Sequence, residues 1–161
     1  MSVQDRYARI QIVLHWAIFL LFVFNYIVSD DMGRALRTKL EGGTPDNFVA
    51  LIHPPIGITL LVLMVLRIIA RLFLGAPEPV DTGKPLLDKA AAWTHIALYA
   101  LLVLIPASGI AAWQFGIREA GEVHEITVNL ALILIIAHSA AALFHQFVLK
   151  DGLLNRMRPG R

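Results

Sequence analysis

The sequence predicts an all-α integral membrane protein whose single domain, residues 1–161, is a bundle of four transmembrane helices. Hydrophobic residues make up 57% of the chain and charged residues 16%, and the mean hydropathy is +0.66. A soluble domain is about 25% charged, so this composition is far from that of a water-soluble protein. The apolar residues also form long blocks instead of short periodic stripes, which indicates that lipid is the main solvent.

Four segments are long enough to span a bilayer. A spanning helix needs roughly 20 mostly apolar residues, because the hydrocarbon core is about 30 Å thick. Such segments are predicted at about 8–28, 48–74, 86–113 and 122–149, with polar loops rich in Gly and Pro between them. The first span begins like a signal peptide, but the NYIVSDD after it has no small-residue cleavage site, so we expect it to remain as a helix.

The distribution of positive charge predicts the orientation. Of the 14 Lys and Arg residues, ten lie at the N-terminus, around the second loop and in the tail, and four lie in the first and third loops. Positive residues concentrate on the cytoplasmic side, so both termini are expected in the cytoplasm. The net charge of +2 is interpreted as this topology signal, and no nucleic-acid partner is expected.

Histidine is the candidate metal ligand. The chain has no Cys, which excludes thiolate metal sites and covalent haem attachment through CxxCH. All six histidines lie within or at the ends of the predicted spans, where ionisable residues are costly and therefore interpreted as functional. A single histidine could equally form an interhelical hydrogen bond, but six such accidents are improbable. The six are His15, His53, His95, His124, His138 and His145.

The spacing of two histidines in the fourth span predicts two cofactors. His124 and His138 are 14 residues apart, which places them within about 40° of one helix face and about 21 Å apart along the axis. Two haems at different depths could each take one ligand from this helix. A single zinc or di-iron site needs ligands about one turn apart, so this spacing excludes it.

Matching depths in the other spans predict the second ligands. His53 lies near the outer end of the second span, level with His124, and His15 lies near the cytoplasmic end of the first, level with His138. The predicted pairs are therefore His53/His124 and His15/His138. Two protein ligands leave no open position on the iron, which favours electron transfer over oxygen activation.

Two histidines remain outside these pairs. His145 competes with His138 because it lies seven residues further along nearly the same face, but it is close to the membrane surface, so His138 is the predicted ligand. His95 and His145 are candidates for quinone binding, where a carbonyl needs a hydrogen-bond donor and a proton. A hydrogen bond to a haem propionate or to the backbone is an equally good interpretation.

The 14-residue step recurs at two other positions. Arg67 lies 14 residues beyond His53, where its guanidinium could contact a haem propionate or, equally, extend to the membrane surface beside Arg71. Gly109 lies 14 residues beyond His95, where a missing side chain would let a flat ring approach, although the nearby Pro106 could make it part of a kink.

The chain resembles the bacterial cytochrome b561 family, small di-haem membrane proteins of which some are superoxide oxidases, and the related cytochrome b subunits of formate dehydrogenase and Ni-Fe hydrogenase. The resemblance rests on RIQIVLHW, IHPPIGITLLVLMVLRIIARL, HIALYALLVLIPASG and VHEITVNLALILIIAHSAAALFHQF. It implies a four-helix bundle in the bacterial inner membrane, with cytoplasmic termini and two haems b. It also implies the ligands His15, His53, His124 and His138, and electron transfer from superoxide to ubiquinone in some members.

One departure concerns the outer surface. The loop QFGIREAGE is short, whereas superoxide-oxidising relatives carry a longer segment there that could help to form the substrate entrance. A positive outer patch would attract an anionic substrate. Four cations could form such a patch, but neighbouring acidic residues offset their charge. The interpretation as ordinary solvated loop charges is therefore favoured. These cations are Arg34, Arg37, Lys39 and Arg118.

Three functions follow from these observations. The leading hypothesis is a di-haem oxidoreductase that moves electrons across the membrane between quinone and a donor, with superoxide favoured; its catalytic residues are not assigned. The second is an electron-transfer subunit of a larger dehydrogenase or hydrogenase, which requires a protein redox partner. The third is a proton-coupled transporter with histidine relays, which would be colourless.

Overall fold

The computed structural model describes residues 6–79 and 82–158, and all regular structure in these ranges is helical. As predicted, four helices are long and apolar enough to cross a membrane. They are α1 (Arg9–Ile27), α3 (Phe48–Leu74), α4 (Pro85–Phe115) and α5 (Arg118–Phe144), the last continued by the short helix η1 (His145–Leu149). Many large apolar side chains on these helices are exposed, as expected for surfaces that face lipid.

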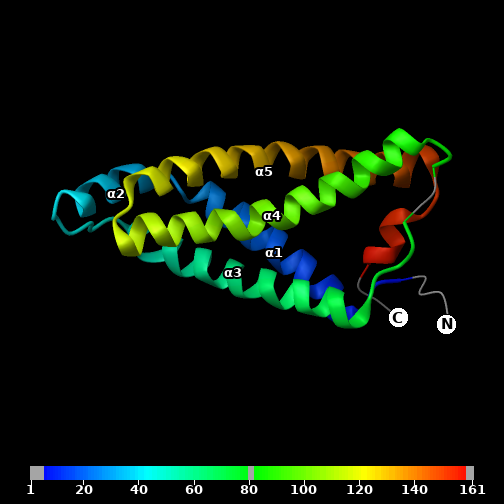
Figure 1. Cartoon of the computed structure of the whole chain (residues 1–161), viewed down its shortest axis with the longest axis horizontal. Helices are drawn as coiled ribbons and strands as arrows, with labels where there is room; N and C mark the ends of the chain where they lie inside the picture. The colour runs from blue at the N-terminus through cyan, green and yellow to red at the C-terminus, as the bar shows by residue number, and fades with distance from the viewer. Residues whose placement is uncertain (1–5, 80–81, 159–161) are drawn as a thin grey trace.

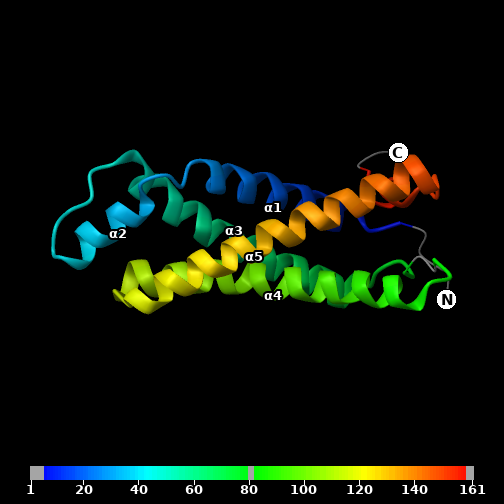
Figure 2. The same cartoon turned by 90° about the horizontal axis from the view of Figure 1, so that it is seen from above.

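The spanning helices form an elongated bundle with two distinct ends (Figure 1, Figure 2). The first and last described residues lie at one end, which we call the terminal end, and helix α2 (Met32–Leu40) lies at the other, the α2 end. Helix α3 packs against α1 and α4, and α4 packs along α5. The backbone of α5 has many close approaches to α4 and few to α1 or α3.

Helix α2 corrects the prediction that the first connection is a loop. Asp31, with φ of 67°, sits in the left-handed region just before the helix and forms an ion pair with Arg34. The signal was present in the sequence, because Met32, Leu36 and Leu40 recur at helical spacing. It was obscured by the charged residues between them, which form the solvent-facing side of an amphipathic helix.

The connection between α4 and α5 is much shorter than predicted. The stretch QFGIREAG was expected to form a loop, but α4 continues to Phe115 and α5 already begins at Arg118. Gly116 ends α4 with φ of 70°, a left-handed conformation that glycine adopts without a steric penalty. The tight connection holds α4 and α5 together as an antiparallel pair.

The C-terminal segment folds back over the terminal end. The π-helix η1 is followed by a 3₁₀ helix, η2 (Leu153–Met157). The Trp16 ring nitrogen donates a hydrogen bond to the Met157 carbonyl over 2.9 Å, and Arg156 donates to the Glu78 carbonyl over 2.7 Å. These bonds attach the C-terminal segment to α1 and to the α3–α4 connection.

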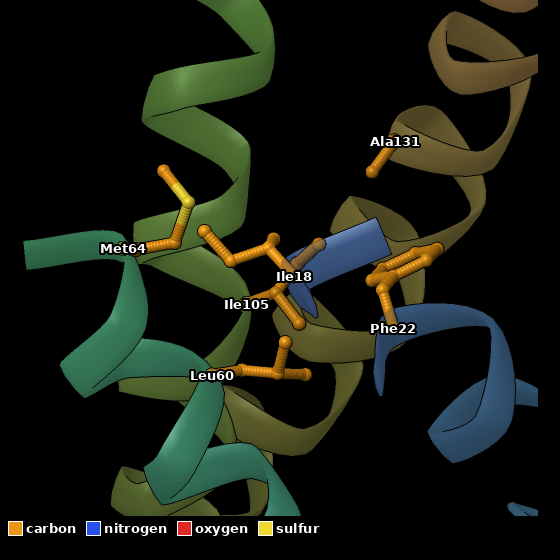
Figure 3. Packing of buried hydrophobic residues seen from close by; sticks show 6 residues of the cluster. All are labelled: Ile18, Phe22, Leu60, Met64, Ile105 and Ala131. Carbon is orange, nitrogen blue, oxygen red and sulfur yellow. The ribbon is translucent and has the colours of Figure 1, made fainter. Parts of the chain in front are cut away.

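Buried apolar side chains from α1, α3, α4 and α5 pack together in an apolar layer (Figure 3). Met64 is 1% exposed and Ala131 is fully buried. On α5, Ala131 lies seven residues after His124 and seven before His138, so the layer is midway between those two histidines. Its buried members are Ile18, Phe22, Leu60, Met64, Ile105 and Ala131.

Candidate functional site

The structure brings His53 of α3 and His124 of α5 together near the α2 end. The centres of their rings are 6.1 Å apart and the ring planes are inclined by 75°. His124 is oriented by its Nδ1–H, which donates to the Ile105 carbonyl of α4 over 2.7 Å. This bond assigns the proton to Nδ1 and leaves the Nε2 lone pair free to bind a metal.

Gly109 is the reason that the His124 ring can lie against α4. A Cβ atom built at position 109 would lie 3.0 Å from Nδ1 of His124 and 3.1 Å from Cε1. The flat ring that approaches this glycine is therefore the His124 imidazole itself. Pro106 lies within the same helix, and both residues line the cavity described below.

We expect Gly109→Ala to displace His124 and to weaken metal binding at this pair by about 10- to 100-fold, the cost typical of disturbing a ligand's supporting contacts. The measurement is the haem content of the purified protein. Gly121→Ala is the matched control, because its new methyl would meet the flexible end of the Leu36 side chain. Equal haem content in the two variants would contradict this assignment.

A second histidine group lies further toward the terminal end. The ring centres of His15 and His138 are 6.4 Å apart, with the planes inclined by 75°, and those of His95 and His138 are 5.1 Å apart. Three histidines from α1, α4 and α5 therefore converge where the sequence predicted a pair. His15 and His138 are half-buried, whereas His95 is exposed.

Arg67 faces this second group. Its Nη1 donates to the Gln11 carbonyl over 2.7 Å, and it is close enough to act electrostatically on His15, His95 and His138. Tyr99 lies near both Arg67 and Arg71, with their guanidinium carbons 5.8 and 5.9 Å from its ring centre. The Arg67 guanidinium thus uses one N–H for a backbone acceptor and has further N–H donors for an anionic group.

His145 lies apart from both histidine groups. Its Nδ1 is 2.5 Å from Oδ2 of Asp151, and the other Asp151 oxygen accepts from the backbone N–H of Leu153 over 3.0 Å. The hydrogen bond from His145 lowers the pKa of the Asp151 carboxyl below its ordinary value. Sequence reasoning missed Asp151, because the turn after η1 brings it back to His145.

Acidification is expected to loosen η2. Because its folded-state pKa is lowered, the Asp151 carboxylate contributes stability that is fully present above about pH 3.9, the ordinary pKa of Asp, and is lost as the pH falls through the lower value. Hydrogen-exchange protection of the η2 amides should decline over this range. Asp151→Asn should have reduced protection at neutral pH and lack this pH-dependent decline; a decline identical to wild type would contradict the role of Asp151.

His53 and His124 line a large cavity. Its volume is about 460 Å³, within the usual range for cofactor pockets of roughly 300–1,000 Å³. Helices α1 to α5 all contribute to its walls. In the described part of the chain, no three His, Asp or Glu side chains form a metal-binding cluster. A metal at either histidine group would therefore need further ligands supplied by a cofactor.

Comparison with known proteins identifies the family. The sequence model described as prokaryotic cytochrome b561 matches residues 6–160. The chain belongs to the prokaryotic cytochrome b561 family. This membership makes the cytochrome a redox protein of the membrane and implies haem b as its cofactor.

Three relatives align with nearly the whole cytochrome. Cytochrome b562 of Cereibacter sphaeroides is 41% identical over 157 residues, 98% of each chain. The probable superoxide oxidase CybB of Yersinia pestis is 30% identical over 175 residues, 96% of each chain. Cytochrome b561 homolog 1 of Escherichia coli is 30% identical over 178 residues, 98% of this chain and 99% of the relative. The family resemblance seen in the sequence is confirmed.

The residues of this cytochrome fit haem b. A metal lies about 2.0 Å from a coordinating imidazole nitrogen, which is itself about 1.2 Å from its ring centre, so two imidazoles on opposite sides of one iron have centres roughly 6.4 Å apart. The His53/His124 and His15/His138 spacings of 6.1 and 6.4 Å match this value. The 5.1 Å between His95 and His138 is shorter.

Proposed function

We propose that this cytochrome holds two haems b and transfers electrons across the bacterial inner membrane from superoxide to ubiquinone. The observation that carries the proposal is the pair of histidine spacings, each suited to one iron and each using one histidine of α5. In this assignment His53 and His124 hold one haem, and His15 and His138 hold the other. When bound, haem b would supply one-electron chemistry at iron, and the two histidines of each pair would leave no position open for oxygen.

The chain's own residues orient and insulate these sites. The Ile105 carbonyl fixes the tautomer of His124, and the apolar layer around Ala131 excludes water between the two histidine groups. Arg67 would neutralise a propionate at the second site through the donors that Gln11 leaves free. These roles are those expected of a rigid electron-transfer protein, in which the protein sets position and electrostatics.

The excess of Lys and Arg near the termini supports an orientation with the terminal end in the cytoplasm. The α2 end then faces the periplasm and would receive superoxide. Lys39 of α2 lies 4.2 Å from the ring centre of Trp113, which lines the cavity at His53 and His124. This places one positive charge near the cavity, where it would attract an anion. One relative is named a probable superoxide oxidase, which supports the same donor.

The quinone would bind near the terminal end. His95 is exposed within the span and adjoins His138, so a quinone arriving through the bilayer could reach it. His145 is the other candidate, and its hydrogen bond with Asp151 provides a histidine–carboxylate pair that could transfer a proton. His95→Ala and His145→Ala should separate the candidates through the KM for quinone.

The deciding experiment uses the purified single chain in detergent. A visible spectrum and a haem assay should show two haems b per chain, and superoxide should reduce ubiquinone at a rate that depends on the protein. A colourless protein would overturn the haem proposal and favour a histidine relay. A haem-loaded chain that is inactive with superoxide, and that purifies with a stoichiometric dehydrogenase or hydrogenase, would indicate the electron-transfer subunit.

A further inference from the structure

Two unpaired polar atoms lie at the His53/His124 pair. Within the described residues, buried side-chain atoms without a hydrogen-bond partner include Oδ1 of Asn25 and Nδ1 of His53. Asn25 is 7% exposed and lines the same cavity as His53. One of these atoms is an acceptor, and the other becomes a donor when it carries the imidazole proton. Buried polar groups are normally paired, so this coincidence requires an explanation.

The Asn25 side chain already contacts the main chain of His53. The Asn25 amide nitrogen donates to the main-chain carbonyl of His53 over 3.4 Å, near the outer limit of a hydrogen bond. The terminal torsion of asparagine has a broad energy minimum, so the carboxamide can turn without leaving its rotamer. The Asn25 main-chain carbonyl also faces the His53 ring, but outside hydrogen-bond geometry.

We propose that the Asn25 carboxamide is the acceptor that positions His53 as a haem ligand. This inference rests on the proposed function. When Nε2 of His53 binds iron, Nδ1 must hold the ring proton, and the Nδ1–H donates a hydrogen bond to Oδ1 of Asn25. Metal-bound histidines nearly always donate their other N–H in this way, which fixes the ring and increases its basicity.

The partner histidine has an equivalent support of a different kind. Nδ1 of His124 donates to the Ile105 main-chain carbonyl, which no side-chain substitution removes. The proposed acceptor for His53 is a side chain, that of Asn25. Substitutions at residue 25 can therefore change the electron affinity of this haem. A stronger acceptor at residue 25 increases the electron density on the imidazole and favours the ferric state, and loss of the acceptor favours the ferrous state.

The test is a redox titration of the purified holoprotein, with EPR spectra of the oxidised form. Asn25→Leu removes the acceptor and should change the relative ferric and ferrous affinities about tenfold, which raises the midpoint potential of one haem by about 59 mV. Asn25→Asp keeps an acceptor and adds charge, so it should lower the same potential. The other haem should keep its potential and serve as the internal reference.

Thr127→Val is the matched control. Thr127 is also buried, but its hydroxyl bonds only to carbonyls of its own helix, those of Val123 and His124. Both potentials should be unchanged in this variant. If Asn25→Leu and Asn25→Asp retain full haem and wild-type potentials, the role of Asn25 is overturned while the proposed function stands. Absence of haem from the wild-type protein would overturn both.

Discussion

His124→Ala is expected to remove one haem per chain and leave the other, so that the haem content falls by roughly half. In the proposed assignment Nε2 of His124 is the ligand atom, because Nδ1 donates its hydrogen bond to the Ile105 carbonyl. The second histidine group is separated from it by the apolar layer, so the remaining haem should keep its spectrum. The measurement is a haem assay on purified protein together with reduced-minus-oxidised difference spectra.

Other histidine variants test the pairing itself. His53→Ala should remove the same haem, and the double variant with His124→Ala should lose nothing more. His15→Ala and His138→Ala should each remove the remaining haem. The second pair is assigned wrongly if His138→Ala or His15→Ala keeps that haem. The same conclusion follows if His145→Ala or His95→Ala removes it instead.

Met64→Ala is expected to destabilise the folded bundle by about 2 kcal/mol, the lower end of the cost for emptying a buried site. Met64 is 1% exposed and lies in the apolar layer between the histidine groups (Figure 3). Lipid is as apolar as the protein interior, so little transfer energy is lost, and the cost is mainly that of the lost packing contacts. Reversible unfolding in mixed micelles measures the difference in free energy.

Val62→Ala provides the control for this substitution. Val62 lies on the same helix but is 52% exposed, so lipid or detergent fills the space left by its methyl groups. Its expected change in free energy is within about 0.5 kcal/mol, as for ordinary surface substitutions. A Met64→Ala variant as stable as Val62→Ala would show that the layer is loosely packed.

The spanning helices were predictable because length and hydropathy act over twenty or more residues. The ends of the helices were not. Gly116 was interpreted as part of a loop, yet it ends α4 within one residue and leaves room for α5 to begin at Arg118. Helix α2 was missed because its apolar side chains, such as Leu36, are separated by charged residues. The position of Leu36 beside Gly121 of α5 depends on how the helices pack, which the local sequence does not reveal.

The placement of the histidines was predictable where helix periodicity alone decides the geometry, and their role as haem ligands stays a prediction. The 14-residue step between His124 and His138 predicted two separate groups, and the structure has two. The contact of His95 with His138 was not predicted, because it depends on how α4 packs against α5. Asn25 was missed for a similar reason: nothing in α1 alone indicates that its carboxamide meets His53 of α3.

Helix α5 contributes a histidine to both groups and is the last spanning helix in the described chain. During synthesis, α1 and α3 enter the membrane first and bring His15 and His53, each without its partner on α5. Neither pair is complete until α5 has been inserted. If the proposed ligand pairs hold, a chain truncated before α5 would lack one ligand at each site and would bind haem weakly at both.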